Sequence, residues 1–88
     1  MNYTVHIKQS ALRSLQRLAK PDRARVDQVL VKLGVNERPA GAIPLSGTGE
    51  GLWRVRAGDW RVVYQIDDAN QIVLVVLIAH RREVYRGL

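Results

Sequence analysis

Apolar and polar side chains alternate along the first residues of the chain, from Tyr3 to Lys8. Successive side chains of a strand point to opposite faces, so this period of two predicts a half-buried strand. A helix is predicted next, because Ser10 suits an N-cap and apolar residues then recur at helical spacing. These apolar residues are Ala11, Leu12, Leu15, Leu18 and Ala19.

A second helix is predicted after a very short connection. Pro21 fits its first turn, where a missing backbone N–H is harmless, and Gly34 stands where a C-terminal cap belongs. Between them, apolar residues again repeat at helical spacing, at Val26, Val29, Leu30 and Leu33. Because the connection is so short, the two helices are expected to form an antiparallel hairpin.

The segment from Val35 to Gly51 is rich in glycine and proline, and it is predicted to be a long loop with one apolar anchor at residues 43–45. The strongest β-hairpin signal follows, from Leu52 to Asp67. Two runs of β-forming residues flank Gly58-Asp59, and a Gly-X pair suits a type II′ turn. After a turn at residues 68–70, Gln71 to His80 is an apolar run typical of a central strand buried on both faces.

The order strand, helix, helix, strand, strand, strand predicts an α+β fold. It consists of an N-terminal strand, an antiparallel helical hairpin and a three-stranded antiparallel meander. The charged tail from Arg81 to Leu88 is either a short helix or mobile. A chain of 88 residues suits one domain, so residues 1–88 are expected to fold together.

Charge narrows the choice of partner. The formal net charge is +6, and eleven of the fourteen basic residues are arginine. The planar guanidinium matches phosphate oxygens and stacks on bases, which favours nucleic acid or a strongly acidic protein as the partner. A basic surface that only aids solubility is the alternative reading.

Several function classes are disfavoured by composition. The chain has no cysteine, so disulfides and thiolate metal sites are excluded. The longest apolar run, residues 72–79, is far shorter than the roughly 20 residues of a membrane-spanning helix. The N-terminal residues have no signal-peptide core, so a cytoplasmic protein without a membrane partner is expected.

The hairpin register predicts a cluster of like charges. If Gly58-Asp59 forms the turn, one face carries Trp53, Val55, Val62 and Tyr64, and the other carries Arg54, Arg56 and Arg61. Arg56 then lies directly opposite Arg61, a like-charge pair that costs up to about 1 kcal/mol. A bound phosphodiester would turn this repulsion into attraction. The alternative is a solvated face on which the arginines pair with Asp59, Glu50 or Glu83.

The tail adds further candidates for the same site. The residues His80-Arg81-Arg82-Glu83-Val84-Tyr85 follow the central strand and could place Arg81, Tyr85 and His80 beside the same anion. Tyrosine stacks on bases or donates a hydrogen bond, and histidine titrates near neutral pH. An ordinary strand-end histidine is an equally open reading of His80.

Together these motifs resemble the RelE branch of the RelE/ParE toxin superfamily. The resemblance rests on residues 52–64, on residues 80–85 and on Leu45-Ser46-Gly47, and it spans nearly the whole chain. It implies a type II toxin that arrests growth by inhibiting translation. Such a toxin cleaves messenger RNA in the ribosomal A site and is neutralised by a RelB-type antitoxin. The implied reaction is metal-independent attack of a ribose 2′-hydroxyl on the neighbouring phosphate.

The resemblance also implies roles for individual residues. The basic residues of the first hairpin strand map to Arg54 and Arg56, that of the next strand to Arg61, the C-terminal arginine to Arg81 with Arg82 as second choice, and the C-terminal tyrosine to Tyr85. Arginine cannot serve as a base, so the three hairpin arginines are expected to hold the phosphate. Arg81 would lie near the leaving oxygen. Tyr85 and His80 are the candidate bases, and Arg82 and His80 are expected to bind RNA.

Two other functions share this fold. One is a ParE-type inhibitor of DNA gyrase, and the other is a non-catalytic module that binds nucleic acid or an antitoxin. Operator DNA is expected as a partner only through the antitoxin. Arg13, Arg17 and Lys20 recur on one side of the first helix, where an ordinary solvated face and a contact with ribosomal RNA are both open.

Overall fold

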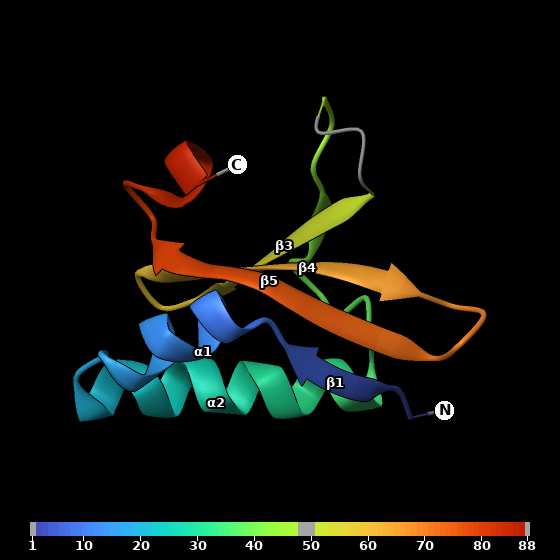
Figure 1. The fold of residues 1–88 in the computed structure, drawn as a ribbon, viewed down its shortest axis with the longest axis horizontal. Helices are drawn as coiled ribbons and strands as arrows, with labels where there is room; N and C mark the ends of the chain where they lie inside the picture. Colours follow the sequence, from blue (N-terminus) through green and yellow to red (C-terminus); the bar gives the residue numbers. More distant parts are fainter. Residues whose placement is uncertain (1, 48–50, 88) are drawn as a thin grey trace.

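The computed structural model describes residues 2–47 and 51–87 and has the expected α+β fold (Figure 1). Its elements in chain order are β1 (Thr4–Ile7), α1 (Gln9–Gln16), α2 (Lys20–Val35), β2 (Ile43–Pro44), β3 (Leu52–Ala57), β4 (Trp60–Asp67), β5 (Ile72–His80) and the short 3₁₀ helix η1 (Val84–Gly87). Within the described ranges, neither α-helix has the length and apolar character needed to cross a bilayer.

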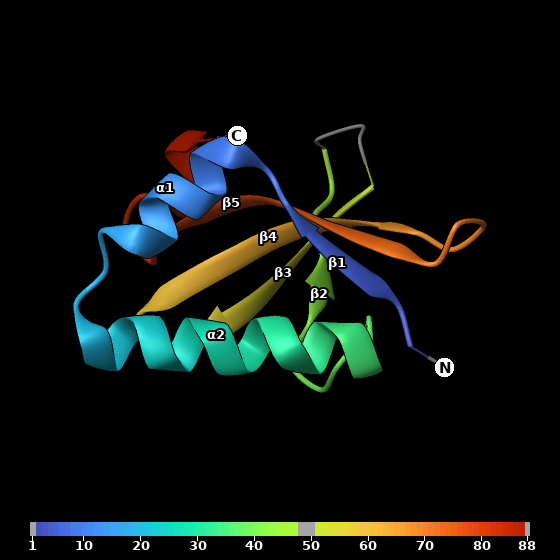
Figure 2. The ribbon, with the colours of Figure 1, turned by 60° about the horizontal axis from the view of Figure 1, so that its bottom comes forward.

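All five strands belong to one mixed sheet in the order β1-β5-β4-β3-β2. Strands β3, β4 and β5 form the predicted antiparallel meander, and β1 pairs with β5 in parallel. Both α-helices lie on one side of this sheet, whereas η1 lies on the other (Figures 1 and 2). The two faces of the central strands are therefore covered by different parts of the chain.

Each face of the sheet has its own apolar cluster. The larger cluster lies beneath the helices and contains the four hairpin residues predicted for the apolar face, Trp53, Val55, Val62 and Tyr64. The smaller cluster joins Leu52 and Val63 to Val84 of η1. Because strand side chains alternate between faces, β3 and β4 supply residues to both clusters. The tail thus forms a short helix that packs on the sheet, one of the two predicted alternatives.

Strand β2 was not predicted and lies within the segment expected to be a loop. Ile43 pairs with Arg54 and Pro44 pairs with Trp53, so the apolar anchor of that segment adds an edge strand to the sheet. Two residues are too few to produce a recognisable period in the sequence. Pro44 is tolerated because an edge strand leaves one side of its backbone unpaired.

The predicted caps of both helices were wrong, although Pro21 does lie in the first turn of α2. Helix α1 begins at Gln9 with Lys8 as N-cap, because the Lys8 N–H donates to Val75 O (2.8 Å) and strand β1 runs directly into the helix. Helix α2 continues past Gly34 to Val35. The Gly34 carbonyl accepts the Tyr3 N–H at 2.7 Å.

Gly34 has a packing role in place of the predicted capping role. A Cβ atom there would lie 3.3 Å from the Tyr3 carbonyl oxygen and 3.5 Å from a Val5 methyl group. Glycine therefore permits the close approach of β1 to the end of α2, which ties the N-terminal strand to the helical layer.

Candidate nucleic-acid interface

The β3–β4 hairpin has the predicted register. Ala57 pairs with Trp60 across the Gly58-Asp59 turn, and Arg56 pairs with Arg61. Gly58 has φ +63°, and a Cβ atom there would lie 3.2 Å from the side chain of Arg25. Only glycine suits this position, as a type II′ turn requires at its first central residue.

Arg54, Arg56 and Arg61 project from the side of the hairpin opposite the helices, and we call this surface the arginine face. Burial lowers the pKa of Arg61 most, and the positive charges of Arg56, Arg54 and Arg81 lower it further. Arg61 therefore lies within reach of the charges of three other guanidinium groups. The three hairpin arginines share one side of the hairpin, as the register predicted, and Arg81 is near Arg61.

Carboxylates do not neutralise the arginine face within residues 2–47 and 51–87. Arg61 Nη1 donates instead to the carbonyl oxygens of Gly58 (2.9 Å) and Trp60 (3.0 Å). Of the three acidic partners considered from the sequence, Asp59 forms an ion pair with Arg81 (3.8 Å to Nε) and not with a hairpin arginine, and Glu83 forms no ion pair in the described part of the chain. The third, Glu50, lies outside the described residues. The face therefore carries concentrated positive charge.

Arg54 is the most buried of these arginines, with 9% of its surface exposed. Its Nε atom is buried and has no hydrogen-bond partner in the part of the chain that the structure describes. A buried donor without a partner costs about 1–3 kcal/mol, and more when it is charged. Folding alone gives no reason to keep arginine at this position, whereas binding of an anion does.

The C-terminal tail folds back onto the arginine face. The Arg81 N–H donates to Asp59 O at 2.8 Å, which holds the start of the tail against the hairpin turn. Val84 is buried in the smaller apolar cluster, and the neighbouring Tyr85 is 62% exposed. Tyr85 is near enough to Arg61 to raise the pKa of that guanidinium, whereas burial and the other arginines lower it. The tail therefore presents an accessible tyrosine beside the basic cluster.

His80 does not join this cluster, contrary to the expected grouping with Arg81 and Tyr85. It pairs with Trp60 across β4 and β5, and the two rings meet edge-on with centroids 5.6 Å apart. This pair lies on the helix side of the sheet, because Trp60 alternates with Arg61. His80 Nδ1 accepts the backbone N–H of Arg82 at 3.3 Å, and the Arg82 side chain is exposed.

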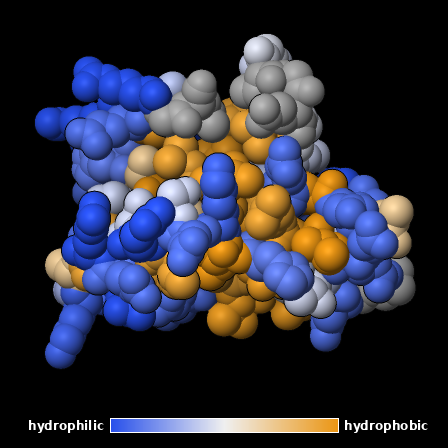
Figure 3. All heavy atoms as spheres, in the orientation of Figure 1, coloured by the Kyte–Doolittle hydropathy of each residue, from blue (hydrophilic) through white to orange (hydrophobic). Residues whose placement is uncertain are grey.

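His80 and Trp60 line a cleft of about 670 Å³ between the end of α1 and the C-terminal tail, together with Arg17, Glu83 and Arg86. Arg17 is one of the three basic residues expected on the first helix, but α1 ends at Gln16 and Lys20 is the first residue of α2. Arg13, Arg17 and Lys20 are exposed, and they form no ion pair with any described residue. Figure 3 shows that strongly hydrophilic surface also gathers over the C-terminal tail.

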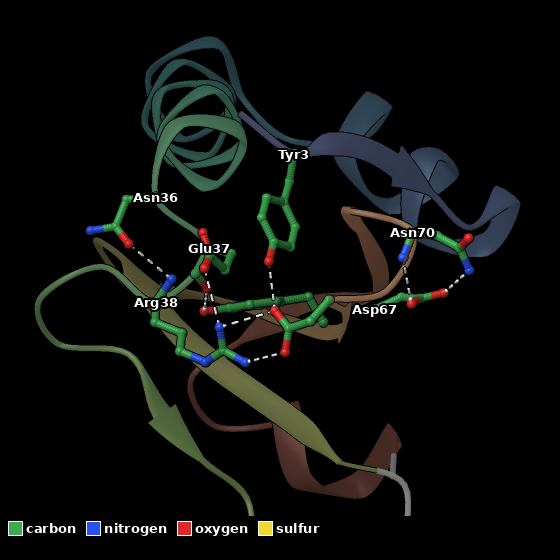
Figure 4. A network of polar contacts seen from close by, with 8 residues as sticks. Tyr3, Asn36, Glu37, Arg38, Asp67 and Asn70 are labelled. Carbon is green, nitrogen blue, oxygen red and sulfur yellow. Dashed lines mark hydrogen bonds and ion pairs between the residues drawn. The ribbon is translucent and has the colours of Figure 1, made fainter. Parts of the chain in front are cut away.

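A second arginine site, at the opposite end of the sheet, was missed by the sequence reasoning. Arg38 contacts both carboxylate oxygens of Asp68, at 2.9 and 3.3 Å, and Tyr3 Oη donates to Asp68 Oδ1 at 2.6 Å (Figure 4). The Arg38 guanidinium lies 5.4 Å from the Trp53 ring centroid. We call Tyr3, Arg38 and Asp68 the Asp68 network. Its members lie far apart in sequence, so no local motif signals it.

The sequence from residue 5 to residue 85 matches the family described as ParE toxin of type II toxin–antitoxin system, parDE. The chain is 44% identical over 85 residues to Toxin RelE from Mycobacterium tuberculosis, which covers 96% of this chain and 87% of that protein. It is 32% identical over 88 residues to Toxin RelG from the same organism, covering 98% and 99% of the two chains.

Solved structures show the same fold. The RelBE2 toxin–antitoxin complex from M. tuberculosis superimposes with a TM-score of 0.81 at 29% identity, covering 92% of this chain and all of that chain. The archaeal RelE–RelB complex from Pyrococcus horikoshii gives 0.80 at 29% identity, covering 92% and 97%. Fold and sequence together define the toxin component of a type II toxin–antitoxin system. The chain belongs to the RelE/ParE toxin family. Its similarity to Toxin RelE relates it to the RelE branch.

Proposed function

We propose that this toxin is a ribosome-dependent endoribonuclease that cleaves messenger RNA in the cytoplasm. The observation that carries the proposal is the arginine face, on which Arg54, Arg56 and Arg61 gather beside Arg81. A phosphodiester would offset their mutual repulsion and accept charge-assisted hydrogen bonds from them. Tyr85 is exposed beside them and suited to stack on a base.

The proposed reaction begins with attack of a ribose 2′-oxygen on the adjacent phosphorus. The O2′–P bond forms as the P–O5′ bond breaks, leaving a cyclic 2′,3′-phosphate and a free 5′-hydroxyl. Arg54, Arg56 and Arg61 would neutralise the added charge of the pentacoordinate phosphorus, which is the part a metal plays in other nucleases. Arg81 would stabilise the departing 5′-oxygen, which takes up a proton.

The base that accepts the 2′-hydroxyl proton is Tyr85 or His80. Tyr85 is favoured, because it lies near enough to Arg61 to influence the pKa of that group, whereas His80 pairs with Trp60. Much of the acceleration would come from aligning the 2′-oxygen with the scissile bond, and the ribosome would supply part of that alignment. Arg82 is exposed next to Arg81 and would contact the RNA strand.

The proposed protein partner is a RelB-type antitoxin. Two similar solved structures are complexes of RelE with RelB or of a RelBE pair. A basic surface of this kind suits an extended, partly acidic segment that folds on binding. Operator DNA would be reached only through that antitoxin, whereas the ribosome and messenger RNA are partners of the free toxin.

Reconstituted translation tests the proposal. Ribosomes carrying a defined message are mixed with the toxin, and the new RNA ends are mapped and analysed by mass spectrometry. Cleavage within translated codons with cyclic phosphate ends is expected from the wild type and from Arg23→Ala, which removes an exposed arginine of α2. Arg61→Ala should reduce cleavage about 10²–10³-fold. Intact messages in a reaction where the toxin still stops peptide synthesis would contradict the proposal.

A second candidate is inhibition of DNA gyrase, since the matching family is described by its ParE toxins. Broken DNA in place of broken RNA after expression would favour it. A non-catalytic binding module is the third candidate. Toxicity that survives Arg54→Ala without cleavage of RNA or DNA would favour that module.

A further inference from the structure

A pocket opens at the edge of the sheet, next to the arginine face. Strands β2 and β3 pair only at Ile43–Arg54 and Pro44–Trp53. The residues before Ile43 therefore do not pair with β3 beside Arg56. The space left beside β3 is a pocket of about 280 Å³, which we call the edge pocket. It is lined by Ala40, Gly41, Ile43, Arg54, Val55 and Arg56.

The edge pocket has the character of an anion site. Arg54 is nine-tenths buried, and its Nε finds no hydrogen-bond acceptor among the described residues. The rest of the lining contains no acidic side chain. An anion entering the pocket would meet the side chains of Arg54 and Arg56, with no carboxylate to compete for them. Ile43, which is 41% exposed, adds an apolar wall.

The spacing of the arginines relates this pocket to the cluster around Arg61. Arg54 and Arg56 are two residues apart on one face of a strand, which separates their Cα atoms by about 7 Å. That distance is comparable with the spacing of neighbouring phosphates along a nucleic-acid strand. Arg56 faces Arg61 across the hairpin, whereas Arg54 faces Ile43 and the edge pocket. The two halves of the arginine face can thus receive successive phosphates.

We propose that the edge pocket is a subsite for the nucleotide next to the scissile phosphate. Its phosphate would lie against the side chains of Arg54 and Arg56, and its sugar would pack on Ile43. The proposal rests on the function proposed above and narrows the role of Arg54 there, from the scissile phosphate to the neighbouring one. The small volume suits a single nucleotide of one strand and excludes a duplex. A carboxylate of a protein partner is disfavoured, because the pocket is continuous with Arg56 and the rest of the arginine face.

The test uses Ala40→Leu, which fills the pocket without changing any charge. Ala40 is exposed, and Ala24→Leu on exposed α2 surface makes the same chemical change away from the pocket. NMR titrations compare a dinucleotide with trinucleotides extended on the 5′ or the 3′ side, each with a 2′-deoxy sugar at the scissile position. Amide spectra of the same samples establish that every variant is folded.

For the wild type and Ala24→Leu, one of the two trinucleotides should bind about tenfold more tightly than the dinucleotide, as expected for one charge-assisted hydrogen bond. Ala40→Leu and Arg54→Met should lose this gain and retain dinucleotide binding. An equal gain in Ala40→Leu and the wild type overturns the subsite. The subsite is also overturned if Ala40→Leu or Arg54→Met weakens binding of a short polyglutamate peptide and leaves trinucleotide binding unchanged. The pocket would then bind a carboxylate of a protein partner.

The same samples separate failure of the subsite from failure of the proposed function. If the wild type does not cleave messages on ribosomes but the trinucleotide gain still depends on Ala40 and Arg54, the edge pocket binds RNA and the nuclease proposal fails. If the wild type cleaves and Ala40→Leu cleaves with the same half-saturating message concentration, the nuclease proposal stands and the subsite fails.

Discussion

Arginine is used in opposite ways at the two ends of this sheet. In the Asp68 network, Arg38 contacts a carboxylate through two nitrogens and lies over the Trp53 ring. On the arginine face, Arg54 is buried with an unpartnered Nε within the described residues, and Arg61 is crowded by three other cations. Charge is paired at one end and concentrated at the other.

The pKa values of the arginines move accordingly. The hydrogen bonds to Asp68 raise the pKa of Arg38, whereas burial and neighbouring positive charge lower the pKa of Arg61. Both groups stay protonated at neutral pH, so the shifts measure how each environment treats a fixed positive charge. The Asp68 network serves folding, and the arginine face costs stability that a bound anion would restore. This contrast leads to four predictions.

The largest expected effect is that Arg61→Met loses RNA cleavage, whereas Arg38→Met loses thermal stability. If Arg61 neutralises the transition state, Arg61→Met should reduce RNA cleavage about 10²–10³-fold, the range seen when one such donor is removed. Arg38→Met should leave cleavage nearly unchanged and lower Tm. Single-turnover cleavage and thermal unfolding of both variants check this. Equal losses of cleavage in the two variants would contradict the division of labour.

The next effect is a gain in stability from Arg54→Met. Methionine keeps much of the volume of the side chain and removes a buried donor that has no partner among the described residues. The free energy of unfolding should rise by about 1 kcal/mol, measured by urea denaturation, while cleavage falls. Arg23→Met, at an exposed position of α2, is the matched control and should change neither quantity. A destabilised Arg54→Met would mean that the guanidinium is satisfied in solution.

A smaller effect is expected from Asp68→Asn, and it depends on pH. The hydrogen bonds from Arg38 and Tyr3 lower the pKa of Asp68, so its ionised form is favoured in the folded state. Its contribution is present above the ordinary carboxyl pKa of about 4 and is lost as the pH falls through the lower folded-state pKa. Tm should therefore differ between wild type and Asp68→Asn at neutral pH and converge in acid. A difference that persists in strong acid would point to packing.

The smallest effect at neutral pH is expected from Tyr64→Phe. Burial raises the pKa of Tyr64 to about 12, and its hydroxyl donates to Glu37 O at 3.0 Å. Its contribution is complete below the ordinary tyrosine pKa of about 10 and is lost as the pH rises from there toward 12. Wild-type Tm should fall across this range more steeply than that of Tyr64→Phe. Ultraviolet titration of the tyrosinate provides an independent check, and parallel alkaline profiles would exclude Tyr64 as the cause.

The arginine face could be predicted from the sequence because every step of the argument is local. Gly58 marks the turn, the turn sets the pairing of Arg56 with Arg61, and the period of two sends Arg54 to the same side. These steps span a few residues and need no knowledge of the rest of the fold. The helical hairpin and the meander were predicted for the same reason, since each depends on a repeating pattern within one segment.

By itself, then, the sequence determined the order of the main elements, the hairpin register and the side of the hairpin that carries positive charge. The tertiary structure alone decided the pairing of β2, the packing role of Gly34, the side of the sheet that His80 occupies and the bonding of Arg38 to Asp68. These features join segments that are distant along the chain, and such contacts depend on how whole elements pack. A local sequence pattern does not specify which distant residues its side chains will contact.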